Sequence, residues 1–256
     1  MKKYKAYFID LDGTMYRGKD PIPGAAEFVK FVQAQSIPFM YLTNNSSAKP
    51  EQVVEKLMNM GIPAADDQVF TSSLATAKYV TSLQSEAKVY VIGEEGLYDA
   101  LEKEGHEVTD DGADYVIVGI DRHISYEKLA KACLNVRNGA KLISTNKDAA
   151  IPTERGMLPG NGAITSVVAV STGVEPIFVG KPEAIAMEQA LNKVGLEKKD
   201  VLMVGDNYET DILAGINAGL DTLMVETGVS SFKDIQHCLK QPTYKMKDLY
   251  EWLKTY

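Results

Sequence analysis

Residues 6–16 read AYFIDLDGTMY, and this stretch decides the fold. A short apolar run leads directly into two carboxylates, Asp10 and Asp12, and ends at Gly13. In an extended strand, residues i and i+2 share a face at about 6.6 Å, where two charges repel by roughly 2.5 kcal/mol at an effective dielectric of about 20. Because a domain has only about 5–15 kcal/mol of net stability, the pair must be well solvated or neutralised by a partner.

Composition indicates a soluble globular protein. The chain has 256 residues, 45% hydrophobic and 24% charged, which suits one large domain or two small ones. Its formal net charge of -8 argues against broad contact with nucleic acid, which needs clustered Lys and Arg. A small anionic substrate held at a local site remains compatible with this charge.

Several features predict a cytoplasmic protein that does not enter a membrane. Cys133 and Cys238 are far apart and form no CxxC motif, so we expect free thiols in a reducing compartment, with a surface disulfide as the alternative. The basic segment Met1-Lys2-Lys3 precedes an apolar run of only four residues, which is too short for a signal peptide. No apolar run approaches the roughly 18 residues of a membrane span.

Short apolar runs alternate with amphipathic stretches along the whole chain, which predicts parallel βαβ units. Helix 24–35 is an example, because Ala25, Phe28, Val29 and Val32 recur on one helical face. The expected strands are 6–9, 38–42, 89–92, 115–118, 141–144, 176–179, 201–204 and 222–225. The expected helices are 24–35, 49–60, 74–83, 96–104, 126–135, 164–172, 183–193 and 210–218.

Polar residues follow four of these strands. Ligands of open parallel sheets bind beyond the carboxyl ends of the strands, so these residues would form one site if the four strands are neighbours. They are Asp10 and Asp12 after the first strand, Thr43, Asn44 and Asn45 after the second, Lys181 after 176–179, and Asp206, Asn207 and Asp211 after 201–204.

Each group alone has a simple structural explanation. The D-x-D-G acids suit a turn, Thr43 and Asn44 suit a helix N-cap, and Lys181 suits a solvated position before a helix that begins with proline. The acids after residue 204 suit the positive end of a helix. Together, however, four carboxylates at one crevice need a cation, and oxygen ligands shared with a substrate phosphate are typical of Mg²⁺. A nearby lysine would bind the anionic end of that substrate.

Other motifs fit poorly. A calcium loop starting at Asp10 would need Gly and Glu where Met15 and Pro21 stand. The GKP at 180–182 lacks the remaining residues of a P-loop, and neither G-x-G-x-x-G nor G-x-S-x-G occurs. The histidines are scattered and do not predict a zinc site or a catalytic triad: His106, His123 and His237.

Four motifs in order resemble those of the haloacid dehalogenase superfamily of phosphohydrolases. They are IDLDGT (9–14), YLTNN (41–45), VGKP (179–182) and VGDNYETD (204–211). The long interval between the second and third is similar to members with a large inserted α/β cap. Four further segments resemble the NagD-like, or nitrophenylphosphatase-like, branch of this superfamily: PGAAEF (23–28), TSSLAT (71–76), TN-D (145–148) and DILAGINAG (211–219).

This resemblance implies a role for each motif residue. Asp10 would be the nucleophile that forms an aspartyl phosphate, and Asp12 would protonate the leaving oxygen and then activate water. Mg²⁺ would be held by the Asp10 side chain, the Asp12 main-chain carbonyl and Asp206, with Asp211 behind or through water. The substrate contacts would come from Asp12, Thr43, Asn44, Lys181 and Asn207.

The expected fold is a doubly wound, Rossmann-like parallel sheet core with an inserted α/β cap. The catalytic core would comprise residues 1–80 and 179–256, and the cap residues 81–178. Within the cap, one loop would either face the phosphate pocket and help choose the substrate or be an ordinary polar surface loop. Its residues are Asn146, Asp148, Pro152 and Arg155.

The sequence thus predicts a Mg²⁺-dependent phosphatase, a hydrolase of small phosphate monoesters such as sugar phosphates, nucleotides or aryl phosphates. Its partner would be a small phosphorylated metabolite, with no nucleic acid and no membrane, and a homodimer is one option. A phosphotransferase or mutase on the same fold is the enzymatic alternative. The non-enzymatic alternatives are a phospho-aspartate signalling module, such as a receiver domain, and a catalytically silent protein of the same fold used for binding. Receiver domains, however, have about 120 residues and an adjacent acid pair after the first strand.

Overall fold

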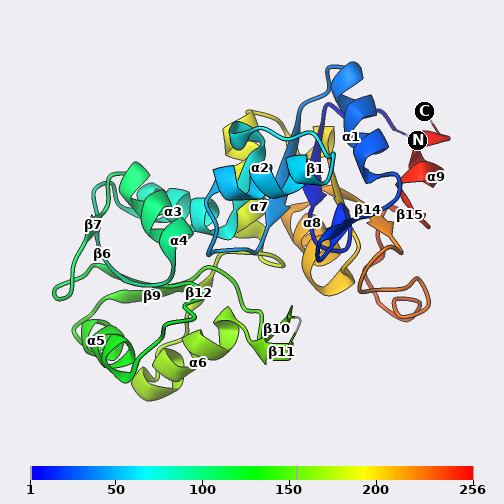
Figure 1. The fold of residues 1–256 in the computed structure, drawn as a ribbon. Coiled ribbons are helices and arrows are strands. Elements are labelled where there is room, and N and C mark those ends of the chain that lie inside the picture. Colours follow the sequence, from blue (N-terminus) through cyan, green and yellow to red (C-terminus); the bar gives the residue numbers. More distant parts are fainter. Residues whose placement is uncertain (1, 154, 256) are drawn as a thin grey trace. The chain divides into compact units, whose positions relative to one another are not determined.

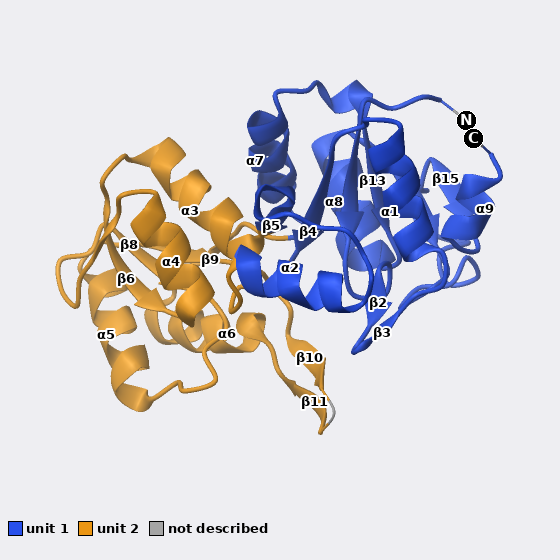
Figure 2. Cartoon of the chain, turned by 45° about the horizontal axis from the view of Figure 1, so that its top comes forward, with its two compact units in different colours: residues 1–43, 50–70, 181–256 blue, residues 44–49, 71–180 orange. Residues whose placement is uncertain are grey.

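The computed structural model describes residues 2–153 and 155–255 (Figure 1). The chain forms two compact units (Figure 2). Unit 1 comprises residues 1–43, 50–70 and 181–256, and unit 2 comprises residues 44–49 and 71–180. The predicted boundaries at 80 and 179, and the roles of core and cap, stay predictions.

Unit 1 is built on a six-stranded sheet whose central strands carry the opening motif. Its pairings from β15 to β4 are parallel, and helices flank it. In spatial order the strands are β15 (Tyr244–Met246), β14 (Asp221–Val225), β13 (Val201–Gly205), β1 (Ala6–Asp10), β4 (Phe39–Thr43) and β5 (Val69–Thr71).

The remaining elements of unit 1 are helices and one small hairpin. The α-helices are α1 (Ala25–Ala34), α2 (Pro50–Asn59), α7 (Ala184–Val194), α8 (Leu213–Ala218) and α9 (Leu249–Leu253). The 3₁₀ turns are η1 (Asp66–Gln68) and η2 (Lys198–Asp200), and η3 (Tyr208–Ile212) is a π-helical turn. The hairpin joins β2 (Tyr16–Arg17) to β3 (Asp20–Pro21).

The core of unit 1 explains why β1 is central. All five residues of β1 are buried, as a continuous apolar run predicts for a strand covered on both faces. The predicted apolar face of helix α1 is buried, and the centre of its Phe28 ring lies 4.6 Å from the ring centre of Trp252 in α9. Tyr7 of β1 packs edge-on against Trp252 at 5.6 Å. Edge-to-face aromatic contacts of this kind add to the stabilisation from apolar burial.

Unit 2 has its own parallel sheet. Its order is β12 (Ile177–Phe178), β9 (Lys141–Ser144), β8 (Tyr115–Val118), β6 (Lys88–Ile92) and β7 (Glu107–Val108), with every neighbouring pair parallel. A hairpin of β10 (Ala150–Thr153) and β11 (Gly156–Pro159) extends from it (Figure 2). The helices are α3 (Ser72–Leu83), α4 (Glu95–Lys103), α5 (Tyr126–Arg137) and α6 (Asn161–Thr172).

The predicted α/β class, with a Rossmann-like parallel core and additional elements, is confirmed. Three of the four strands that precede polar motifs are neighbours, since β1 lies between β4 and β13. The fourth, predicted at 176–179, is β12 and belongs to the sheet of unit 2, so the condition that all four strands are neighbours is not met by this strand. Helix 210–218 is also corrected, because its first part is the π turn.

Two further predictions concern the cysteines and the membrane. Cys133 and Cys238 are both free thiols, as expected. Across the described residues, no helix combines the length and apolar character needed to span a membrane.

Candidate active site

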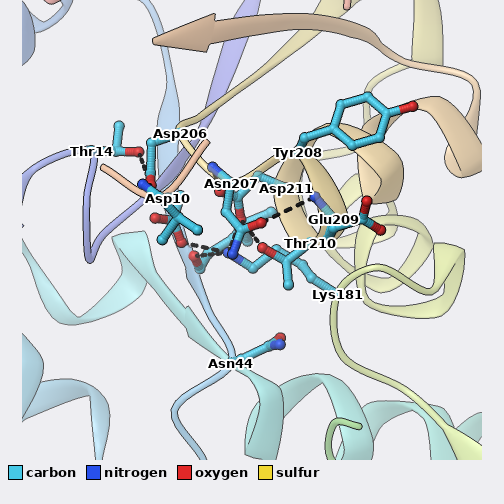
Figure 3. Close-up of polar contacts among 12 residues, drawn as sticks. Asp10, Thr14, Asn44, Lys181, Asp206, Asn207, Tyr208, Glu209, Thr210 and Asp211 are labelled. Atoms are coloured by element: carbon cyan, nitrogen blue, oxygen red, sulfur yellow. Dashed lines mark hydrogen bonds and ion pairs between the residues drawn. The ribbon is translucent and has the colours of Figure 1, made fainter. Parts of the chain in front are cut away.

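Three buried carboxylates meet beyond the ends of β1 and β13 (Figure 3). Asp10 is the last residue of β1, Asp206 directly follows β13, and Asp211 lies in the π turn η3. One carboxylate oxygen from each lies within 4.8 Å of the others. The parallel register of β1 and β13 accounts for the meeting of residues almost two hundred positions apart.

Lys181 supplies the positive charge between two of these acids. Its Nζ donates to Asp10 Oδ1 at 2.5 Å and to Asp211 Oδ1 at 2.6 Å, and it also donates to the Leu42 carbonyl at 3.3 Å. The side chain is 4% exposed. One ammonium offsets only one of three carboxylate charges, so ionised acids would leave an excess of two negative charges. An all-oxygen donor set with that excess fits a hard divalent cation.

The pKa values reflect this crowding. Burial raises the pKa of Asp10 well above its usual range, Asp211 raises it further, and Lys181 opposes both. Burial and the charge of Asp211 raise the pKa of Asp206 to about 6, against hydrogen bonds from Val229 and Thr14. Burial lowers the pKa of Lys181, but the charges of Asp10 and Asp211 outweigh burial and raise it, so the lysine stays protonated.

The Asp206 carboxylate is held by two hydrogen bonds and packs closely against two glycines. Thr14 Oγ1 donates to its Oδ1 at 3.0 Å, and the Val229 amide donates to Oδ2 at 2.7 Å. A Cβ on Gly13 would lie 2.4 Å from this carboxylate, and one on Gly228 would lie 1.9 Å from it. Gly13 also has φ +95°, so only glycine suits the turn that follows the D-x-D motif. Thr14 closes the IDLDGT motif but had no predicted role, whereas Gly228 and Val229 lie outside every motif and could not be predicted from the sequence.

Asp211 is positioned by the turn that carries it. The Asn207 amide donates to Asp211 Oδ2 at 3.0 Å, and the Asn207 side chain accepts from the Glu209 amide at 3.0 Å (Figure 3). A Cβ on Gly205 would lie 2.3 Å from the Asp211 Cβ, so the glycine lets the turn approach the strand end. Asn207 therefore builds the turn, and its predicted substrate contact stays a prediction.

The remaining predicted site residues lie as follows. Asp12 is exposed in the loop after β1, and Thr43 is the half-buried last residue of β4. Asn44 belongs to unit 2, where its Nδ2 donates to Asp148 Oδ2 at 3.2 Å. Asn45 caps the next turn, accepting from the Ser47 and Ala48 amides.

The loop predicted to choose the substrate has two different parts. Asn146 is buried, and its Nδ2 donates to the Asn44 carbonyl at 2.9 Å, so this part is a built element of unit 2 and not a polar surface loop. Pro152 lies in β10, and the exposed Arg155 stands next to β11, where its amide donates to Thr153 Oγ1 at 3.1 Å. Their contact with a substrate stays a prediction.

Comparison with known proteins shows the family. Residues 7–107 match the family model described as haloacid dehalogenase-like hydrolase, and residues 178–252 match a second described as HAD-hydrolase-like. These matches contain Asp10, Lys181, Asp206 and Asp211.

Relatives match over nearly the whole length. The chain is 54% identical to the 5'-nucleotidase YutF of Bacillus subtilis, covering 99% of each chain. It is 56% identical to the acid sugar phosphatase of Staphylococcus aureus strain USA300, covering 98% of this chain and 97% of the other. A thermostable NPPase double mutant from Geobacillus stearothermophilus has a similar structure, with TM-score 0.93, 57% identity and 98% and 99% coverage. This chain belongs to the haloacid dehalogenase-like hydrolase family.

Proposed function

We propose that this protein hydrolyses small phosphate monoesters through an aspartyl phosphate on Asp10, with Mg²⁺ as its metal ion. It is a phosphatase, as its relatives of closely similar length are named. The observation that carries the mechanism is the cluster of Asp10, Asp206 and Asp211 around the Lys181 ammonium. A nucleophilic carboxylate must stay ionised while it meets a phosphate dianion, and among these neighbours the Lys181 ammonium favours the ionised form of Asp10.

In the first step, a carboxylate oxygen of Asp10 attacks phosphorus. The bond between phosphorus and the ester oxygen breaks, and the leaving oxygen takes a proton from Asp12. Exposure of Asp12 on the loop after β1 leaves it free to reach that oxygen. Lys181 lies 2.5 Å from the nucleophile, so its charge is already in place when charge develops on the phosphoryl oxygens.

In the second step, Asp12, now a carboxylate, takes a proton from a water molecule that attacks phosphorus. The bond between phosphorus and Asp10 breaks, which releases inorganic phosphate and restores the Asp10 carboxylate. Thr43, at the end of the neighbouring strand β4, and Asn44, the next residue in the chain, are proposed as donors to the phosphoryl oxygens. Lys181 holds Asp10 in one orientation through both steps.

The metal ion would be held by Asp10 and Asp206 with the Asp12 main-chain carbonyl, and Asp211 would support it. When bound, it would neutralise phosphoryl charge and draw the phosphate onto the nucleophile. The two negative charges of the cluster that Lys181 would leave unbalanced are what support a divalent ion here.

The substrate is proposed as a small phosphorylated metabolite, a sugar phosphate or nucleotide, because relatives bear names of these kinds. We further infer that unit 2 acts as the cap, that the protein works in the cytoplasm without nucleic acid, and that a homodimer is compatible with this role. Transfer of the phosphoryl group to a second sugar is the competing reaction, since the carboxylates serve either acceptor.

The test is hydrolysis of p-nitrophenyl phosphate with Mg²⁺ and with chelator. We expect turnover that chelation abolishes, and a loss of more than about 10³-fold in Asp10→Asn, because nucleophilic catalysis is removed. The exposed Asp20 in β3 gives a matched control, and Asp20→Asn should keep full activity. Turnover that survives chelation, or an Asp10→Asn variant as fast as wild type, would refute the mechanism. Stoichiometric release of inorganic phosphate into water separates hydrolysis from transfer.

A further inference from the structure

Tyr16 is an unexplained polar side chain beside the proposed acid/base residue. The chain turns back after Asp12, so that the Gly13 amide donates to the Tyr16 carbonyl at 2.8 Å and the Tyr16 amide donates to the Leu11 carbonyl at 3.2 Å. A β-bridge therefore joins Asp12 to Tyr16. The loop carries the tyrosine back to the strand end where the carboxylates meet.

The Tyr16 side chain is buried but its hydroxyl is not paired. Tyr16 is 7% exposed, and among residues 2–153 and 155–255 its hydroxyl has no hydrogen-bond partner. Burial raises the pKa of Tyr16, and the charges of Asp12 and then Asp10 raise it further. The buried polar atoms without a partner among the described residues do not include this hydroxyl, so its oxygen is accessible at the surface while the ring is buried.

Lys56 is a second unpaired donor at the same place. It lies on α2 in the same unit, and its Nζ is 3.7 Å from the centre of the Tyr16 ring. Within the described residues, no hydrogen bond or ion pair holds this ammonium. The ring under this ammonium belongs to the residue that bridges to Asp12, so Lys56 reaches the turn that carries Asp12. Lys56 would therefore be a second cation of the proposed site, in addition to Lys181.

We propose that Tyr16 and Lys56 form a subsite for the leaving group of the substrate. The Tyr16 hydroxyl donates to an oxygen of that group, and the Lys56 ammonium pairs with a negative charge on it. This inference rests on the proposed function, because Asp12 protonates the leaving oxygen and donors beside Asp12 meet whatever that oxygen is attached to. Lys181, paired with Asp10, serves the phosphoryl side instead.

The chemistry selects a class of substrates. A neutral alcohol gains only the Tyr16 hydrogen bond, whereas a leaving group with its own carboxylate or phosphate also gains the Lys56 charge. Phosphate monoesters with a second anionic group are therefore the preferred class. A carboxylate and a phosphate share this chemistry, so both are tested.

The first experiment compares kcat/KM for three hexose derivatives: glucose 6-phosphate, 6-phosphogluconate and glucose 1,6-bisphosphate. We expect wild type to favour the two substrates with a second anionic group over glucose 6-phosphate. Lys56→Met should reduce that preference about 3- to 10-fold, mainly through KM, and Lys56→Arg should retain it. A fall confined to one anionic substrate tells whether the carboxylate or the second phosphate is recognised. Lys30 of α1 is also exposed, and Lys30→Met is the charge-matched control.

The Tyr16 part has its own variant. Tyr16→Phe keeps the ring under Lys56 and should lower kcat/KM about 3- to 10-fold for all three substrates, because only the hydroxyl is lost. Tyr126 is 87% exposed, and Tyr126→Phe should change nothing. A preference that is the same in wild type and Lys56→Met, or a Tyr16→Phe variant indistinguishable from wild type, overturns the corresponding half of the subsite.

A binding experiment separates this inference from the proposed function. Calorimetry measures Kd for 6-phosphogluconate with Asp10→Asn protein, with and without Lys56→Met, in buffer containing Mg²⁺. We expect Lys56→Met to weaken binding about 3- to 10-fold, whereas equal Kd values overturn the subsite. If wild type hydrolysed none of the esters, the proposed function would fail, but the two Kd values would still decide whether Lys56 binds the anion.

Discussion

Gly13 shows how a residue with no side-chain functional group determines the geometry of the site. Its place in the D-x-D-G turn is fixed by φ +95° and by the Asp206 carboxylate, which a Cβ would approach to 2.4 Å. That carboxylate cannot retreat without losing its bonds to Thr14 and Val229. The glycine therefore sets both the turn and the position of a proposed metal ligand.

We expect Gly13→Ala to lower the free energy of unfolding by about 2–4 kcal/mol and to abolish most phosphatase activity. Gly18 is the matched control, since it also has a positive φ, +61°, but nothing lies within 4 Å of its Cβ position. Gly18→Ala should cost only about 1 kcal/mol and spare activity. Urea unfolding and turnover of p-nitrophenyl phosphate measure both effects, and equal losses in the two variants would contradict the steric argument.

At this scale the sequence indicated which charged residues gather but not how they are held. The structure brings Asp10, Asp206 and Asp211 around Lys181, and their catalytic roles stay predictions. The supporting contacts of Thr14 and Val229 arise from a tertiary fold that joins distant loops. Short motifs carry no signal for such contacts, because any hydroxyl or backbone amide could supply them.

At the scale of elements, strand β14 is tied to the start of the chain by Asp221. Its Oδ2 accepts from Lys2 Nζ at 2.9 Å and from the Tyr4 hydroxyl at 2.8 Å. Burial raises the pKa of Asp221, but these hydrogen bonds and the charge of Lys2 outweigh burial and lower it. A carboxyl whose pKa is lowered in the folded state stabilises that state above the unfolded pKa, about 3.9, and loses this effect as pH falls through the folded value.

Asp221→Asn should therefore reduce the free energy of unfolding by about 1 kcal/mol at pH 7, discounted for the partial exposure of the pair. The gap to wild type should narrow steadily below about pH 4. Urea unfolding from pH 7 to pH 3 measures this, with Asp20→Asn as a control that shows no gap at any pH. A gap independent of pH would show that the carboxylate charge is not responsible.

Elements were predicted well where apolar runs were long and poorly where pairing is decided by topology. Helix α1 and the central strand β1 follow directly from their patterns. The sequence could not predict that β12 belongs to the second sheet. This strand has only two residues, and so short an apolar segment could pair with either sheet. The π turn of η3 depends on Gly205 admitting Asp211, which is again a tertiary contact.

At the scale of the whole molecule, the single tryptophan reports on one unit. Trp252 is fully buried in unit 1, in contact with Phe28, and the proposed metal ligands lie in the same unit. A ligand that binds only the folded state raises its apparent stability, by about 2.7 kcal/mol at one hundred times Kd. Tryptophan fluorescence therefore follows the unit that the metal ion should stabilise.

We expect Mg²⁺ to move the thermal transition seen by fluorescence to higher temperature and chelator to reverse the shift. Asp206→Asn should remove most of the shift, whereas Asp20→Asn should keep it. The same shift in Asp206→Asn as in wild type would show that Mg²⁺ acts elsewhere on the protein.

The discontinuity of unit 1 has a consequence for how the protein is made. Strand β1 pairs with β13, so the proposed nucleophile leaves the ribosome long before the strand that completes its surroundings. At about 5–20 residues per second, the delay is on the order of 10–40 s. Unit 2 is synthesised almost entirely within that interval and has its own core. The nascent chain therefore carries Asp10 without these partners until Lys181, Asp206 and Asp211 have been synthesised, and a chain that terminates before them lacks the assembled carboxylate cluster.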